Sequence, residues 1–168
     1  MLDALLLVYL IVHTVVGPLI DAQAVLPDAF PSLASFYERA GLVHVVSSWC
    51  ADHGDFLMAE RPVWFKAAVW AEIMLQVPTC AVLSLGWARR QEWVRLPSIM
   101  YSVHVLTTMV PIMAVLLIEG AARASPPSAV CIGAYAVWVA LPALLLWRCM
   151  TAGERLFERA KDPTLKGA

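Results

Sequence analysis

Four long apolar runs dominate the pattern of hydrophobic and polar positions, over residues 2–20, 62–87, 97–118 and 127–147. Each run is long enough to cross a bilayer, because a transmembrane helix needs about 20 mostly apolar residues. The last three runs open with Pro62, Pro97 and Pro127, and proline suits the first position of a helix, where no backbone N–H is needed. The pattern therefore predicts an all-α membrane protein, a four-transmembrane-helix bundle over residues 1–150. Residues 151–168 are expected to form a cytosolic tail that begins with a short solvated helix over 151–161.

Composition agrees with a membrane protein, since 61% of the residues are hydrophobic and only 15% are charged. Soluble domains have roughly 45–50% apolar and about 25% charged residues. The formal net charge of −1 gives no footprint for nucleic acid, so we expect no nucleic-acid partner. The four cysteines form no CxxC-type pair, and we expect neither a metal nor a cofactor.

The basic residues predict the orientation of the spans. Eight of the twelve lysines and arginines lie on the side of the termini and the second loop, and four lie on the side of the first and third loops. Cytosolic segments carry the excess of basic residues in membrane proteins. Both termini are therefore expected in the cytosol.

Ionisable side chains inside the spans point to a functional site, because such groups are costly at membrane depth. Glu72 lies ten residues after Pro62, which places it about 15 Å into the second span at a rise of about 1.5 Å per residue. Gln76 follows one turn later on the same face. Pro78 interrupts the hydrogen-bond ladder of this helix, and a kink there would widen a cavity.

Further polar side chains accompany Glu72. Asp21 ends the first apolar run and lies eight residues after His13, so the two side chains point in a similar direction. In the third span, Tyr101, His104 and Thr108 form a polar stripe. Asp55 lies in the loop before the second span. Each of these residues also has a structural interpretation, as a helix–helix hydrogen bond, a solvated boundary residue or a turn cap.

A contact between Asp21 and Glu72 would create a carboxyl pair with specific chemistry. Two carboxyl groups in a dry site cannot both ionise cheaply, so one keeps its proton. The pair could then hold a cationic amine, or it could donate a proton to an alkene and accept one elsewhere.

Several strings resemble one family along nearly the whole chain. They are Asp21-Ala22-Gln23-Ala24-Val25-Leu26-Pro27, Glu60-Arg61-Pro62-Val63-Trp64-Phe65-Lys66, Glu72-Ile73, Gln76-Val77-Pro78, Tyr101-Ser102-Val103-His104, Thr107-Thr108, Pro111-Ile112, Tyr135-Ala136 and Leu141-Pro142. Their order and spacing resemble the EXPERA family, its sigma-2 receptor branch most closely and its emopamil-binding sterol isomerases more distantly.

The resemblance implies a pocket inside the bilayer of the endoplasmic reticulum that opens sideways to lipid. It implies that Asp21 pairs with a ligand amine, that Glu72 is its protonated partner and that Asp55 is a further acid needed for binding. Residues implied to contact the ligand are Asp21, Asp55, Met58, Glu72, Gln76, Tyr101, Thr108, Tyr135 and Trp138. With the resemblance, the segment from Ser32 to Trp49 is interpreted as a lid helix over the non-cytosolic mouth.

Two departures from the family pattern are visible. Trp138 stands where a tyrosine is expected, which keeps an aromatic face but loses a hydroxyl. The C-terminal residues 165–168 lack a dilysine-type retrieval signal.

Two main functions remain open at this stage. The first is a protein of sterol and lipid homeostasis that binds a sterol, an oxysterol or another hydrophobic or cationic amphiphile. The second is an isomerase or cyclase for a sterol or terpenoid, with Glu72, Asp21 and His104 as catalytic acid–base groups and aromatic rings to stabilise a carbocation. A transporter is disfavoured because no inverted repeat is visible. Membrane lipids are expected partners, and a homodimer stays open although no GxxxG motif favours one.

Overall fold

The computed structural model describes residues 1–157, and these residues contain helices and turns but no strand. Four helical segments are long and apolar enough to cross a membrane, which confirms the predicted four-span fold. A helix pairs its backbone N–H and C=O groups with each other, and lipid supplies no other hydrogen-bond partner for them. The first span consists of α1 (Leu2–Leu19) and the 3-10 turn η1 (Asp21–Ala24); the second of α6 (Val63–Ala71), the π-helical turn η2 (Glu72–Gln76) and α7 (Val77–Ala88); the third of η3 (Glu92–Val94) and α8 (Arg95–Ala121); and the fourth of α9 (Ala129–Thr151).

The sequence predicts proline at the first helical position of three spans, but the structure places these prolines elsewhere. Pro62 is the residue that precedes the first turn of α6, and Pro97 is the third residue of α8. Pro127 lies before Ser128, whose hydroxyl accepts a hydrogen bond from the Cys131 backbone N–H and caps α9. A side-chain cap satisfies a free N–H of the first turn, so it defines this helix start better than proline does.

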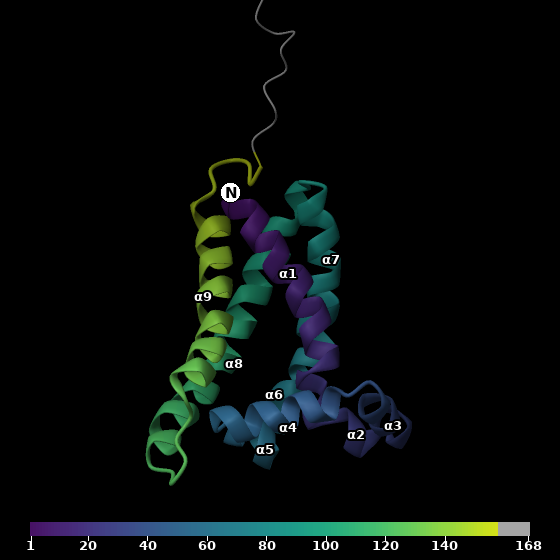
Figure 1. Cartoon of the computed structure of the whole chain (residues 1–168). Coiled ribbons are helices and arrows are strands. Elements are labelled where there is room, and N and C mark those ends of the chain that lie inside the picture. Colours follow the sequence, from purple (N-terminus) through teal and green to yellow (C-terminus); the bar gives the residue numbers. More distant parts are fainter. Residues whose placement is uncertain (158–168) are drawn as a thin grey trace, which may run out of the picture.

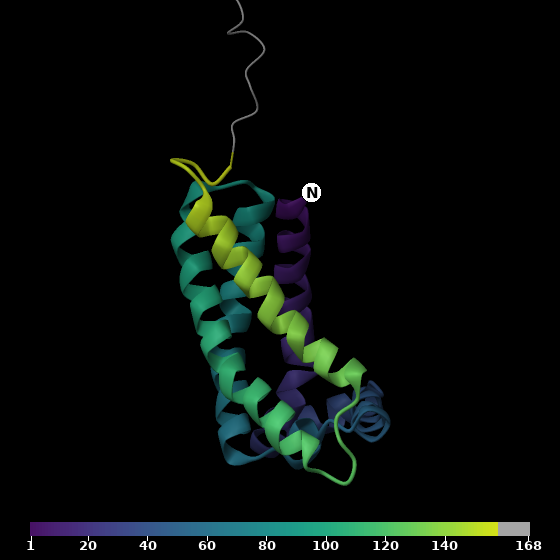
Figure 2. The same cartoon turned by 90° about the vertical axis from the view of Figure 1, so that its left-hand side faces the viewer.

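The four spans pack as two pairs. α1 lies along α7, and α8 lies along α9. Figure 2 shows α9 running obliquely across the bundle instead of parallel to α1. The N-terminus and residues 152–157 lie at one end of the bundle, and the helices of the first loop lie at the other end (Figure 1).

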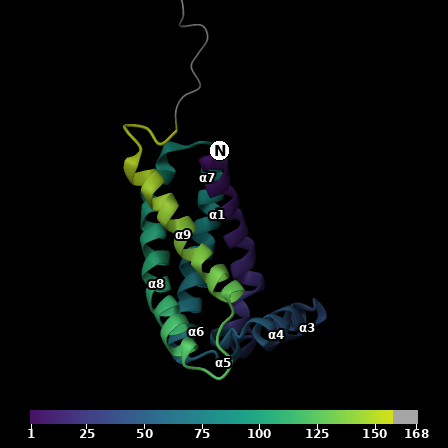
Figure 3. The ribbon, with the colours of Figure 1, turned by 60° about the vertical axis from the view of Figure 1, so that its left-hand side comes forward.

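The first loop forms four short helices across this second end of the bundle. They are α2 (Leu26–Ala29), α3 (Pro31–Arg39), α4 (Leu42–His53) and α5 (Phe56–Glu60), and α3 extends beyond the four spans (Figure 3). The single lid helix expected from Ser32 to Trp49 is therefore two helices. Gly41 separates them because its φ of 72° is left-handed, a conformation that glycine adopts readily.

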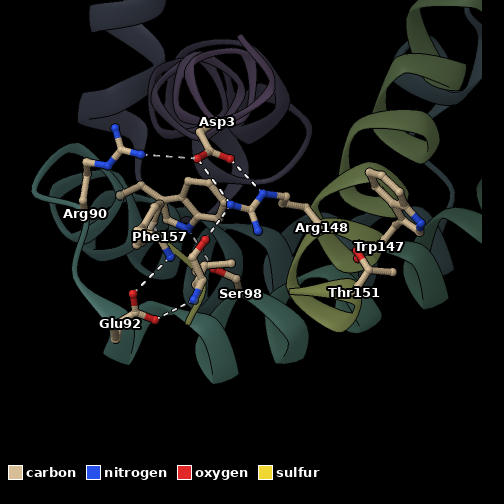
Figure 4. A network of polar contacts seen from close by, with 10 residues as sticks. Asp3, Arg90, Glu92, Ser98, Trp147, Arg148, Thr151 and Phe157 are labelled. Atoms are coloured by element: carbon tan, nitrogen blue, oxygen red, sulfur yellow. Dashed lines mark hydrogen bonds and ion pairs between the residues drawn. The ribbon is translucent and has the colours of Figure 1, made fainter. Parts of the chain in front are cut away.

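A polar network closes the end of the bundle where the N-terminus lies (Figure 4). Arg148 of α9 donates a 2.9 Å hydrogen bond to Asp3 of α1, and the Arg90 guanidinium lies 4.0 Å from the same carboxylate. Glu92 accepts hydrogen bonds from the backbone N–H groups of Leu156 and Phe157, at 2.7 and 3.0 Å. The network holds the chain after α9 against α1 and the second loop.

The same network corrects the prediction of a solvated helix after residue 151. Residues 152–157 are not helical, because Arg95 binds the carbonyl groups of Cys149, Ala152 and Gly153 that a continuing helix would use. Leu156 and Phe157 are buried, so this part of the tail packs on the bundle. The remainder of the predicted helix and residues 165–168 lie outside the described residues.

Candidate functional site

A cavity of about 340 Å³ lies inside the bundle, between the spans and the helices of the first loop. Small-molecule sites are typically mostly apolar clefts of roughly 300–1,000 Å³ with a few polar groups. All four spans contribute to its wall, together with α4, Asp55 and α5. The lining residues are His13, Val16, Ile20, Asp21, Val45, Val46, Trp49, Asp55, Met58, Phe65, Ala68, Val69, Glu72, Gln76, Val105, Thr108, Met109, Ile112, Ala134, Tyr135 and Trp138.

Most residues that the sequence assigns to ligand contact line this cavity. They are Asp21, Asp55, Met58, Glu72, Gln76, Thr108, Tyr135 and Trp138. Tyr101 lies one layer behind the wall, where its hydroxyl contacts His13. His104 also lies behind the wall and contacts Gln76. The cavity thus collects the polar side chains of the spans on one inner surface.

The carboxyl groups of Asp21 and Glu72 line the same cavity and lie close enough for the charge of one to act on the other. Spacing alone puts Asp21 at the end of the first span and Glu72 near the middle of the second. The two groups meet because the first span continues past α1 into η1, where Ala22, Gln23 and Ala24 are buried. Asp21 therefore begins a turn whose next three residues are buried in the bundle.

A π-helical turn presents Glu72 and Gln76 to the cavity. The Val77 backbone N–H donates to the Glu72 carbonyl five residues earlier, so this turn contains one residue more than an α-helical turn and is wider. Pro78 follows directly and has no N–H to offer the preceding turn. The sequence predicts a kink at this proline, and the structure shows the wide turn just before it. Turns of this kind occur often at functional sites.

Gly17 allows α1 to approach this wide turn closely. A Cβ atom at position 17 would lie 2.6 Å from Val77 Cγ2 and 3.3 Å from Glu72 Oε1. Ordinary carbon–carbon contacts are about 3.5–4.0 Å. The absent side chain therefore sets the distance between the two spans that carry the carboxyl pair.

Glu72 also begins a chain of hydrogen bonds that leaves the cavity. Its Oε1 lies 3.0 Å from His13 Nε2, and His13 Nδ1 lies 2.6 Å from the Tyr101 hydroxyl. The Tyr101 hydroxyl in turn lies 2.6 Å from the Tyr9 hydroxyl. His13 is 2% exposed, Tyr9 3% and Tyr101 4%, so the chain runs through the dry interior.

A second polar group holds Gln76 against the third span. The Gln76 side-chain amide donates to His104 Nδ1 at 3.1 Å and to Thr108 Oγ1 at 3.3 Å. The His104 ring therefore positions Gln76, while Gln76 and Thr108 face the cavity.

Asp55 joins the first loop to the fourth span. Its carboxylate accepts hydrogen bonds from the Met58 backbone N–H at 3.1 Å, from Trp49 Nε1 at 3.0 Å and from the Tyr135 hydroxyl at 3.1 Å. Asp55 is 2% exposed, and it caps the first turn of α5. The turn-cap interpretation of Asp55 therefore holds, and the same side chain also forms part of the cavity wall.

Comparison with known proteins places this arrangement in a family. The chain matches the model for EBP, described as EXPERA (EXPanded EBP superfamily), over residues 42–149. The chain belongs to the EXPERA family. Sigma intracellular receptor 2 of Homo sapiens and that of Macaca fascicularis are each 31% identical to it over 127 residues, which cover 72% of this chain and 65% of the receptor. The Xenopus tropicalis receptor is 35% identical over 114 residues, which cover 67% of this chain and 63% of the receptor.

The chain spans about 65% of the length of the curated relatives it matches. The resemblance drawn from the sequence is thereby confirmed at the level of the EXPERA family and its sigma-2 receptor members. This match does not assign the activity of the whole receptor to the chain.

Besides apolar lining residues, three hydrogen-bonding side chains of this EXPERA protein's site were absent from the sequence-based assignment of ligand contacts. His13 and Trp49 line the cavity, and Tyr9 continues the chain of hydrogen bonds behind it. The spacing of His13 from Asp21 was a usable signal for the first. Nothing in the sequence pairs Tyr9 with Tyr101, because the two lie in different spans.

Proposed function

We propose that this EXPERA protein binds a sterol or another hydrophobic or cationic amphiphile in the cavity, through the carboxyl pair of Asp21 and Glu72. In this proposal the protein acts in sterol and lipid homeostasis. The presence of both carboxyl groups in the wall of a mostly apolar cavity is the observation that carries the proposal. A carboxylate in a low-dielectric site attracts an ammonium far more strongly than it does in water.

The shape and lining of the cavity support a rigid apolar ligand. Apolar side chains from all four spans surround the pair. An amphiphile would place its amine or hydroxyl at Asp21 and its hydrocarbon part against Val105, Met109 and Ile112. The similarity to proteins named sigma intracellular receptor 2 supports a binding function as well.

A binding titration with a cationic amphiphile tests the proposal in the purified protein. We expect Asp21→Asn to lower the affinity by roughly ten- to hundredfold, since a charge-assisted hydrogen bond contributes about 1.5–3 kcal/mol. Asp28→Asn is a matched control, because the Asp28 side chain is 53% exposed and does not line the cavity. Equal affinities of Asp21→Asn and the unmodified protein would exclude the proposed ligand geometry.

Glu72→Gln tests the second member of the pair. We expect it to keep the fold and to alter the affinity, because the amide fills the same space but cannot share a proton with Asp21. Size-exclusion chromatography distinguishes this outcome from a structural role, in which the variant would not be recovered as a folded protein.

The alternative function is an isomerase or cyclase for a sterol or terpenoid, with the same pair as acid and base. The His13 and Trp138 rings, whose centroids lie 4.8 Å apart, form an aromatic wall beside the carboxyl groups. Such a face can stabilise a developing carbocation. One carboxyl would protonate a carbon–carbon double bond, and a proton would then leave a neighbouring carbon, so the reaction needs no redox partner.

Turnover of a Δ8 sterol distinguishes the two functions. The sterol is incubated with the purified protein and analysed by gas chromatography with mass detection, with Glu72→Gln alongside. A shifted double bond that depends on Glu72 would establish the isomerase. Sterol that is recovered bound and unchanged would favour the binding protein.

The cellular location is part of the proposal. We place the protein in the endoplasmic reticulum membrane, as the family resemblance implies. Both termini are placed in the cytosol, as the distribution of basic residues suggests. Protease protection of an N-terminal tag in intact microsomes tests this orientation, and a protected tag would reverse it.

A further inference from the structure

The hydrogen-bond chain behind the cavity can run in two directions, and only one of them leaves no hydrogen without an acceptor. Four side chains make three contacts, from Glu72 through His13 and Tyr101 to Tyr9. A neutral imidazole carries one N–H, and each phenol carries one O–H. Tyr9, Tyr101 and His13 thus supply three hydrogens for three contacts.

The direction of the chain follows from its buried end. Among the residues that the structure describes, Tyr101 is the only hydrogen-bond partner of the Tyr9 hydroxyl. If Tyr9 donates to Tyr101, then Tyr101 donates to His13 Nδ1, and the hydrogen on His13 Nε2 points to Glu72. In the opposite direction the Tyr9 hydrogen would be buried without an acceptor, which native structures avoid. A doubly protonated His13 would also leave the Tyr9 hydrogen buried without an acceptor.

We propose that His13 is a positioning residue for the carboxyl pair: it donates its Nε2 hydrogen to Glu72, and Tyr101 and Tyr9 hold it in that tautomer. The importance of this role rests on the proposed function of the cavity. Glu72 Oε1 accepts from His13, so a proton that the pair keeps lies on Glu72 Oε2 or on Asp21. Glu72 is thereby anchored in the wall, and Asp21 is the carboxyl free to meet a ligand.

The chain also excludes His13 as a proton acceptor for Glu72. Its Nε2 already carries a hydrogen, and its Nδ1 accepts from Tyr101. A proton moved along the chain from Tyr9 would leave a phenolate in a dry interior, which is strongly unfavourable. Protons must therefore reach the pair through the cavity and not through this chain.

Nuclear magnetic resonance of the ring nitrogens tests the inference in the full chain without ligand. We expect His13 to show the Nε2–H tautomer, with its signals identified as those lost in His13→Gln. Tyr101→Phe should shift the resonance of the unprotonated Nδ1, which loses its donor. In Tyr9→Phe this resonance should stay near its original position, because Tyr101 still donates. An Nδ1–H tautomer or a doubly protonated ring in the unmodified protein would overturn the inference.

Ligand affinity gives a second measurement. His13→Gln keeps one donor for Glu72 and one acceptor for Tyr101, whereas His13→Leu removes both. We expect His13→Leu to bind a cationic amphiphile about tenfold more weakly and His13→Gln to stay within about threefold of the unmodified protein. Tyr37→Phe is the control, because the Tyr37 hydroxyl donates to the Pro18 carbonyl and does not line the cavity.

The two measurements separate failure of this inference from failure of the proposed function. If the tautomer is as expected and the unmodified protein binds no amphiphile, the hydrogen-bond chain stands and the proposed function falls. If the amphiphile binds and His13 carries its hydrogen on Nδ1, the binding function stands and the inference falls. Equal affinities of His13→Leu and the unmodified protein would also overturn the positioning role.

Discussion

The close approach of α1 to η2 at Gly17 predicts that Gly17→Ala impairs the site more than it impairs the fold. The new Cβ atom would lie 2.6 Å from Val77 Cγ2 and 3.3 Å from Glu72 Oε1. An ordinary contact is roughly 3.5 Å, so the two elements must separate by about 1 Å. The wide turn η2 is the element expected to move, because its hydrogen bonding is already irregular.

The stability change from Gly17→Ala should be small because two effects oppose each other. Overpacking costs about 1–3 kcal/mol, and alanine gains about 1 kcal/mol over glycine in a helix. The His13–Glu72 hydrogen bond responds more strongly. Its length of 3.0 Å would increase to about 4 Å, and a hydrogen bond to a charged group contributes about 1.5–3 kcal/mol.

A binding titration with a cationic amphiphile measures this effect, with thermal unfolding as the stability control. We expect Gly17→Ala to lower the affinity about tenfold. Gly133→Ala is the matched control, because Gly133 lies in a membrane-spanning helix and its Cβ would meet no atom within 4 Å. Unchanged affinity of Gly17→Ala would refute the argument that this glycine sets the position of Glu72.

Two further predictions concern the helices of the first loop. Asp55→Asn should lower the melting temperature by about 4–12 °C, since one buried donor loses its acceptor at a cost of about 2–3 kcal/mol; an unchanged melting temperature would contradict the role of Asp55 in joining this loop to α9. The Lys66 ammonium lies 2.7 Å from the Asp28 carboxylate and lowers the pKa of Asp28 below its usual range. This ion pair gives a small stabilisation that is present above about pH 4. The stabilisation is lost as the pH falls through the lower pKa of the folded state. The difference in melting temperature between the unmodified protein and Asp28→Asn should therefore shrink from about pH 6 to about pH 3, and a difference that grows on acidification would contradict this assignment.

The sequence by itself determined the number of spans, their approximate ends and the family. These properties follow from local patterns, because a bilayer imposes length and hydrophobicity on each span separately. The sequence also marked Asp21, Glu72 and Gln76 as unusual, since a polar group inside an apolar run is visible without any knowledge of its neighbours. The family resemblance then suggested which of these groups would meet.

Only the tertiary structure decided which groups are partners and which direction their hydrogen bonds take. The meeting of Asp21 with Glu72 depends on the turn η1, which keeps the chain inside the bundle after Leu19. The wide turn at Glu72 and the packing of the tail on Trp87 depend on contacts between segments far apart in the chain. His13, Tyr9 and Tyr101 come together from two spans, and the physical reason lies in the arrangement of α1 and α8 in the folded bundle. The periodicity of one span cannot predict a contact between two spans. Only the folded bundle removes these groups from lipid, and inside it they have only each other as hydrogen-bond partners.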